Sequence, residues 1–258
     1  MSQFGNAPTA GKRRHFVSYG PVCLDDRQYY VTKLAAGKSR DVFLVRNTPW
    51  VVKMEVQCRV DAPAETHALV QLFGGRRDWR ANEHELQAFK AVGAGTYAPQ
   101  LPNGNALRFG FFENAKKQMV PVCALFVEAL ANPDLQMPFR EAAQRRDVAQ
   151  LNSLVRNGVL TIWQAGQAGV VAADMTLDNL GVRDNGDVVI CDLGEWTKSD
   201  AIKMKKATTN FLASCTGMLK PFPIILDTFQ WASGWCKPAL APPGFIDGGS
   251  EYLIGLCC

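Results

Sequence analysis

The first half of this 258-residue chain is a series of short strand patterns separated by turn residues. Apolar and β-branched runs alternate with Gly-, Asn- and Pro-containing turns, a pattern that is typical of short antiparallel strands. The strand runs are residues 29–34, 42–45, 50–56, 106–112 and 120–127. One helical pattern, 79–92, lies between the third and fourth runs and ends at two glycines. The order β-β-β-α-β-β predicts an antiparallel sheet that carries one helix.

In the second half of the chain, apolar residues recur mainly at the spacing of a helix. Residues 140–167 carry an apolar stripe at helical spacing, which predicts one long helix. The stripe consists of Leu151, Leu154, Val155, Val159, Ile162 and Trp163. Two short apolar runs, 180–182 and 188–191, flank an Asn-Gly pair, which predicts a β-hairpin. Residues 57–78 are expected to be irregular, and the pattern after residue 198 is unclear.

Composition limits the classes of partner and compartment. Apolar residues make up 47% of the chain and charged residues 20%, which indicates a folded core. A net charge of +4 is too weak to predict nucleic-acid binding. No apolar run is long enough for a membrane helix, and the eight cysteines include no Cys-x-x-Cys pair. We therefore expect an intracellular, reducing compartment, with residues 1–20 forming a flexible basic tail.

Three oxygen-bearing residues lie where the predicted loop and hairpin would bring them together. Asp174 and Asn179 are five positions apart in a loop, and Asp192 follows the hairpin. Carboxylate and amide oxygens are the ligands that Mg²⁺ prefers, and Mg²⁺ is usually shared with substrate phosphates. A remaining carboxylate can then orient or deprotonate a nucleophile.

These residues resemble the protein-kinase superfamily. Its catalytic loop carries Asp and Asn at this spacing, and its Asp-Phe-Gly motif follows a short hairpin, as Asp192-Leu193-Gly194 does here. Val51-Val52-Lys53 is similar to that superfamily's Val-Ala-Ile-Lys strand. The resemblance implies an α+β, bilobal protein kinase-like fold, with an antiparallel β-sheet N-lobe holding one helix and a reduced, mainly helical C-lobe. The lobes would be residues 21–128 and 129–258, together one catalytic domain.

The resemblance also implies a role for each matching residue. Asp174 would be the catalytic base toward a hydroxyl. Lys53 would contact the phosphates of ATP and be held by Glu83, with Glu85 as the second choice. Asn179 and Asp192 would hold Mg²⁺. The remaining nucleotide-binding residues would be Gly37, Lys38 and Ser39 over the phosphates, and Val127, Glu128 and Leu130 near the adenine.

The function implied is that of an ATP- and Mg²⁺-dependent protein kinase that phosphorylates Ser or Thr of a partner protein. The compact outline is similar to that of bacterial effectors delivered into a host cytosol, which would act on host proteins. Two departures leave alternatives open. Thr176 stands where Ser/Thr kinases carry a Lys. Small-molecule phosphotransferases of the aminoglycoside or choline kinase type also lack this Lys. Only Gly37 remains of the superfamily's glycine-rich loop, which is compatible with a nucleotide-binding pseudokinase scaffold.

Overall fold

A computed structural model describes residues 19–36, 40–75, 80–172, 174–222, 224, 226–229 and 232. The predicted phosphate-covering residues Gly37, Lys38 and Ser39 lie outside these described residues, as does most of the predicted basic tail. The chain divides into two compact units. The first comprises Met1–Asn82 and Asn105–Phe126, and the second comprises Glu83–Gly104 and Val127–Cys258.

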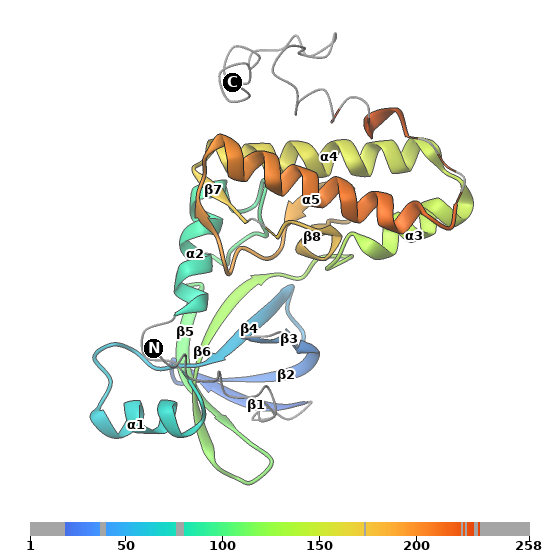
Figure 1. Cartoon of the computed structure of the whole chain (residues 1–258). Helices are drawn as coiled ribbons and strands as arrows, with labels where there is room; N and C mark the ends of the chain where they lie inside the picture. The colour runs from blue at the N-terminus through green and yellow to red at the C-terminus, as the bar shows by residue number, and fades with distance from the viewer. Residues whose placement is uncertain are drawn as a thin grey trace, which may run out of the picture. The chain divides into compact units, whose positions relative to one another are not determined.

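The first unit contains a closed barrel of six strands, in the order β1-β2-β3-β4-β6-β5 (Figure 1). The strands are β1 (Tyr19–Leu24), β2 (Arg27–Ala36), β3 (Asp41–Val45), β4 (Trp50–Val56), β5 (Leu107–Glu113) and β6 (Met119–Glu128). Alternate side chains of these strands point inward. In the core, the ring centroids of Phe43 and Phe112 are 6.2 Å apart. Five of these strands are the predicted ones, and none of their ends differs from the prediction by more than two residues.

The predicted kinase-like arrangement, with an open antiparallel sheet in an N-lobe and a helical C-lobe, is wrong, because the sheet closes on itself. The closing strand is β1, which pairs antiparallel with both β2 and β5. The sequence analysis missed β1 because Gly20 and Pro21 are poor strand residues. Gly110 makes the closure possible, since a Cβ at this position of β5 would lie 1.8 Å from the Cys23 carbonyl oxygen of β1.

The segment between β4 and α2 (Ala81–Val92) contains a helix where the sequence predicted irregular structure. This helix is α1 (Ala64–Leu72), whose Val70 is buried. The start of α2 is fixed by a carboxylate from the barrel. Glu55 of β4 accepts hydrogen bonds from the amides of Ala81 and Asn82, at 3.1 and 2.9 Å. It thereby supplies the acceptor that a helix N-terminus needs.

The described residues of the second unit include the rest of α2, further helices and two small sheets. The helices are α3 (Gln136–Arg145), α4 (Val148–Gln167) and α5 (Ala201–Leu219). The sheets pair β7 (Val170–Val171) with β10 (Thr197–Lys198), and β8 (Leu180–Val182) with β9 (Val188–Ile190). The β8–β9 hairpin and the buried stripe of α4 confirm the predictions.

Two expectations for this unit need correction. The single long helix predicted over 140–167 is two helices, because Arg146 takes a left-handed conformation (φ 57°) and Asp147 then caps α4. Helix α5, for which the sequence offered no clear pattern, begins at an N-cap, Asp200, and packs along α4 (Figure 1). Within the described part of the chain, no helix combines the length and apolar character needed to cross a membrane.

Two glycines provide a matched test of the α4–α5 packing. A Cβ at Gly158 of α4 would lie 2.4 Å from the Phe211 ring, which is fully buried in α5. We expect Gly158→Ala to lower the free energy of unfolding by about 1–3 kcal/mol through overpacking. Gly217 of α5 has no atom within 4 Å of an added Cβ, so Gly217→Ala should raise stability by about 0.5–1 kcal/mol. Urea denaturation of both variants checks this, and equal effects would contradict the described packing.

Candidate functional site

The predicted catalytic loop lies between β7 and β8 in the second unit. A short 3₁₀ turn, η1 (Leu177–Asn179), occupies its end, and fully buried Leu177 anchors that turn in the core. The Leu177 carbonyl accepts the amide of Leu135 at 2.9 Å, which ties the loop to the start of α3. Asp174 is exposed, and its carbonyl oxygen accepts a 3.0 Å hydrogen bond from Nδ2 of Asn179. The loop therefore presents a carboxylate from a fixed backbone.

The hairpin brings the backbone of Asp192 against Asn179. The register of β8 and β9 pairs Leu180 with Ile190, so Asn179 comes opposite the residues that follow β9. The Asn179 carbonyl oxygen accepts the amides of Cys191 at 2.8 Å and Asp192 at 3.4 Å. Asn179 thus joins the two segments that carry Asp174 and Asp192.

Asp192 is exposed and held by its own turn. Its Oδ1 accepts a 3.0 Å hydrogen bond from the amide of Gly194. The Asn179 side chain donates through Nδ2 and also carries an amide oxygen, which is an acceptor group. A carboxylate and an amide oxygen fit the hard-oxygen preference of Mg²⁺, which also keeps waters and takes ligands from substrate phosphates. Among the described residues, no group of three or more His, Cys, Asp or Glu side chains is arranged to hold a metal ion.

The residues after Asp192 are fixed by α2. Glu85 is fully buried, and its carboxylate accepts the amide of Leu193 at 2.9 Å. One residue earlier, the His84 ring stacks on Trp196 at 4.7 Å and an interplanar angle of 16°. Nε1 of Trp196 donates to the His84 carbonyl at 2.9 Å, and the His84 Nε2 lies 3.2 Å from the Trp196 carbonyl. These contacts hold residues 193–196 against α2.

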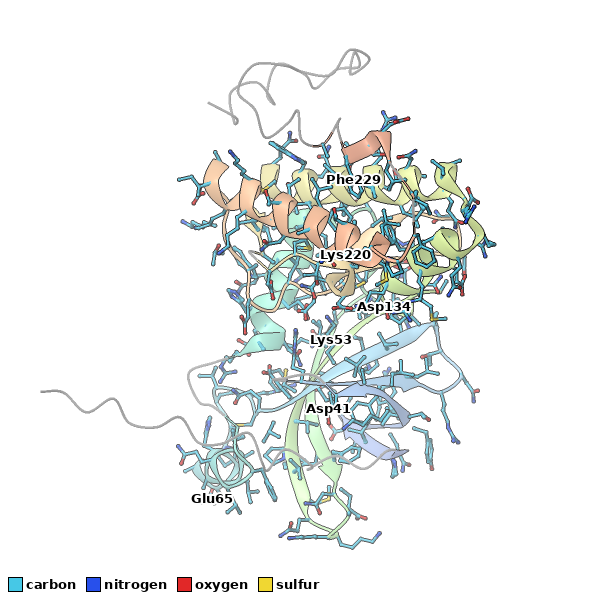
Figure 2. The ribbon with its side chains drawn as sticks, turned by 45° about the vertical axis from the view of Figure 1, so that its right-hand side comes forward. Asp41, Lys53, Glu65, Asp134, Lys220 and Phe229 are labelled. Atoms are coloured by element: carbon cyan, nitrogen blue, oxygen red, sulfur yellow. The ribbon has the colours of Figure 1, made fainter. Side chains whose placement is uncertain are left out.

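Lys53 lies in the first unit, on β4 opposite Val42 of β3, and is 9% exposed (Figure 2). Its own carbonyl oxygen accepts Nδ2 of Asn82 at 2.8 Å, and the same Nδ2 donates to the Cys123 carbonyl of β6 at 2.9 Å. Asn82 is fully buried, so it fixes the backbone that carries Lys53. Glu83 is half-buried in the second unit. The pairing of Lys53 with Glu83 stays a prediction.

The residues predicted near the adenine belong to a second hydrogen-bonded frame. Glu128 is linked to Arg183 by three contacts of 3.0–3.1 Å, and the Glu128 carboxylate also accepts the amide of Gln100 at 2.8 Å. Its backbone amide donates to the Gln100 carbonyl at 2.9 Å. Val127 is buried, and Leu130 lies against Gly181 of the hairpin. The adenine-binding role of these residues stays a prediction.

Sequence reasoning missed three residues around the site, Arg183, His84 and Trp196. It also did not predict that Glu85 is buried. Arg183 follows β8 directly and donates to the carbonyls of Thr96 and Ala98 as well as to Glu128. No local pattern predicts such contacts, because the partners lie 55 to 112 positions away in the sequence. The one available signal was the choice between Glu83 and Glu85, since a helix that buries Ala88 and Phe89 also buries position 85.

A scan against models of known protein families finds no match, and a search of curated proteins finds no significantly similar sequence.

The Glu85–Leu193 bond is tested by removing its acceptor. We expect Glu85→Ala to destabilise the chain by about 1–3 kcal/mol, because it leaves a buried amide without its acceptor. Hydrogen exchange at the Leu193 amide should accelerate by roughly tenfold or more for the same reason. Gln87→Ala, an exposed change on the same helix, is the control and should alter neither measurement. Unchanged exchange at Leu193 in Glu85→Ala would contradict the described role.

Proposed function

We propose that this protein is an ATP- and Mg²⁺-dependent phosphotransferase that transfers the γ-phosphate of ATP to a hydroxyl, Ser or Thr, of a partner protein. The proposal depends on the chemistry of the second unit's site and on the kinase-like motif spacing, and not on a kinase-like fold. The observation that carries it is the double role of Asn179, whose side chain contacts the Asp174 segment and whose carbonyl contacts the Asp192 segment.

Asp174 is the residue suited to act on the acceptor hydroxyl. It is an exposed carboxylate on a backbone held by Asn179, so it can accept the proton of a hydroxyl placed against it. A base of this kind must lie within hydrogen-bond reach of that proton, which a rigid loop achieves better than a mobile one.

Asn179 and Asp192 are the residues suited to hold Mg²⁺. When bound, the ion would neutralise charge on the phosphate oxygens during transfer. The chain itself supplies the positioning, because Asp192 is fixed by the Gly194 amide and its neighbour Leu193 by Glu85. Lys53 is the predicted phosphate contact from the first unit.

The proposal is tested with the full chain, γ-labelled ATP, Mg²⁺ and a cell extract. We expect label in discrete protein bands, and a loss of about 10²–10⁴-fold in Asp174→Asn, the range that a general base contributes. Asp192→Asn should lose transfer as well and should need more Mg²⁺ for any residual activity. Asp184→Asn removes an exposed carboxylate from the nearby hairpin turn and is the matched control, with activity unchanged.

Three results would contradict the proposal. Label only in small molecules would favour the small-molecule phosphotransferase that Thr176 left open. ATP binding without any transfer would favour the scaffold alternative. Transfer that survives in both Asp174→Asn and Asp192→Asn would locate the chemistry elsewhere in the protein.

A further inference from the structure

In the first unit, the thiol of a cysteine after β4 lies against the ring of a histidine in α1, and the proposed function uses neither residue. Sγ of Cys58 lies 3.3 Å from Nδ1 of His67, within hydrogen-bond distance. Cys58 comes two residues after the end of β4, and His67 is the fourth residue of α1. Both residues belong to the first unit.

The orientation of the ring makes Nδ1 the basic atom. Nε2 of His67 lies 3.2 Å from the carbonyl oxygen of Val60. A carbonyl oxygen can only accept, so Nε2 carries the hydrogen and donates it. In the neutral ring, Nδ1 then presents its lone pair to the Cys58 thiol. Cys58, His67 and the Val60 carbonyl thus supply a nucleophile, a base and a group that orients the base. These are the parts that an activated nucleophile needs.

The backbone of Cys58 is held in place and bears a positive neighbour. Its amide donates to Oε1 of Gln57 at 3.0 Å, and its carbonyl accepts NH1 of Arg80 at 3.3 Å. The chain turns directly after Cys58, and this turn is closed by a 3.2 Å hydrogen bond from the Ala62 amide to the Arg59 carbonyl. Cys58 is 4% exposed, whereas Val60 in that turn is 75% exposed.

We propose that Cys58 is a redox-modification site whose thiol reacts with hydroperoxides. His67 takes the thiol proton, and Sγ attacks the terminal oxygen of the hydroperoxide. The S–O bond forms as the O–O bond breaks, and the departing alkoxide or hydroxide takes the proton back from His67. Sulfur is oxidised to a sulfenic acid, and the hydroperoxide is reduced to an alcohol or water. This modification site is independent of the phosphotransferase proposal.

Two other cysteines of the chain serve as internal references. Cys23 is exposed on β1, so it reports the rate of an accessible thiol. Cys215 is fully buried in α5, and burial raises the pKa of its thiol well above the ordinary value. Cys215 should therefore stay unmodified for as long as the chain is folded.

The test treats the full chain with dilute hydrogen peroxide, traps sulfenic acid with dimedone and follows each cysteine by peptide mass spectrometry. We expect Cys58 to be trapped about tenfold faster than Cys23, despite its lower exposure, because the thiolate is the reactive form. His67→Phe keeps a ring but removes the base, and should bring the Cys58 rate to that of Cys23 or below. Glu65→Gln, on the same helix (Figure 2), is the control and should leave the rate unchanged.

Equal rates at Cys58 and Cys23 in the native chain, or no effect of His67→Phe, would overturn the proposal. Labelling of Cys215 would show that a variant has unfolded, and a second measurement then decides. The iodoacetamide rate at Cys58 is compared in the native chain and in guanidinium. A thiol activated by His67 reacts faster in the folded chain, and a slower reaction there would overturn the proposal.

Discussion

Within each unit, glutamate carboxylates accept backbone amides and thereby fix the start of a helix or a segment between elements. Glu55 of β4 accepts two amides at the start of α2, and Glu85 of α2 accepts the amide of Leu193. Glu128 does the same for Gln100 while paired with Arg183. Charged acceptors form stronger hydrogen bonds than neutral ones, and removing Glu55 or Glu85 leaves a buried amide unsatisfied. Each glutamate therefore fixes a boundary that the local sequence leaves undefined.

The sequence predicted the elements whose period is unbroken. Strands β2 to β6, helix α2, the α4 stripe and the β8–β9 hairpin were all readable from alternation, helical spacing or the Asn-Gly pair. The elements it missed carry conflicting local signals. Strand β1 contains Gly20 and Pro21, and α5 mixes lysines with small polar residues. These elements depend on partners far along the chain, such as β5 for β1 and α4 for α5, so no local window predicts them.

That same dependence explains why the fold prediction failed although most strands were found. An open sheet and a closed barrel use the same strand patterns, and they differ in whether the two edge strands meet. In this protein the edge strands meet because Gly110 has no side chain, which allows β5 to approach the Cys23 carbonyl of β1. A glycine inside a strand pattern signals close backbone approach, but it does not name the strand that approaches.

The sequence predicted those parts of the candidate site whose positions depend only on residue spacing within the loop and the hairpin. It did not predict the contacts that distant segments of the chain make with them. Asp174, Asn179 and Asp192 follow from a loop and a hairpin, whose backbone brings them together without long side chains. What fixes the hairpin lies outside it. Val182 exchanges backbone hydrogen bonds with Asn132, at 2.9 and 3.1 Å. A Cβ at Gly181 would lie within 2.5–2.9 Å of Cys191, Leu130 and Asn132. The segment predicted near the adenine and the segment predicted to hold Mg²⁺ therefore share one backbone framework, and a side chain at position 181 would push them apart.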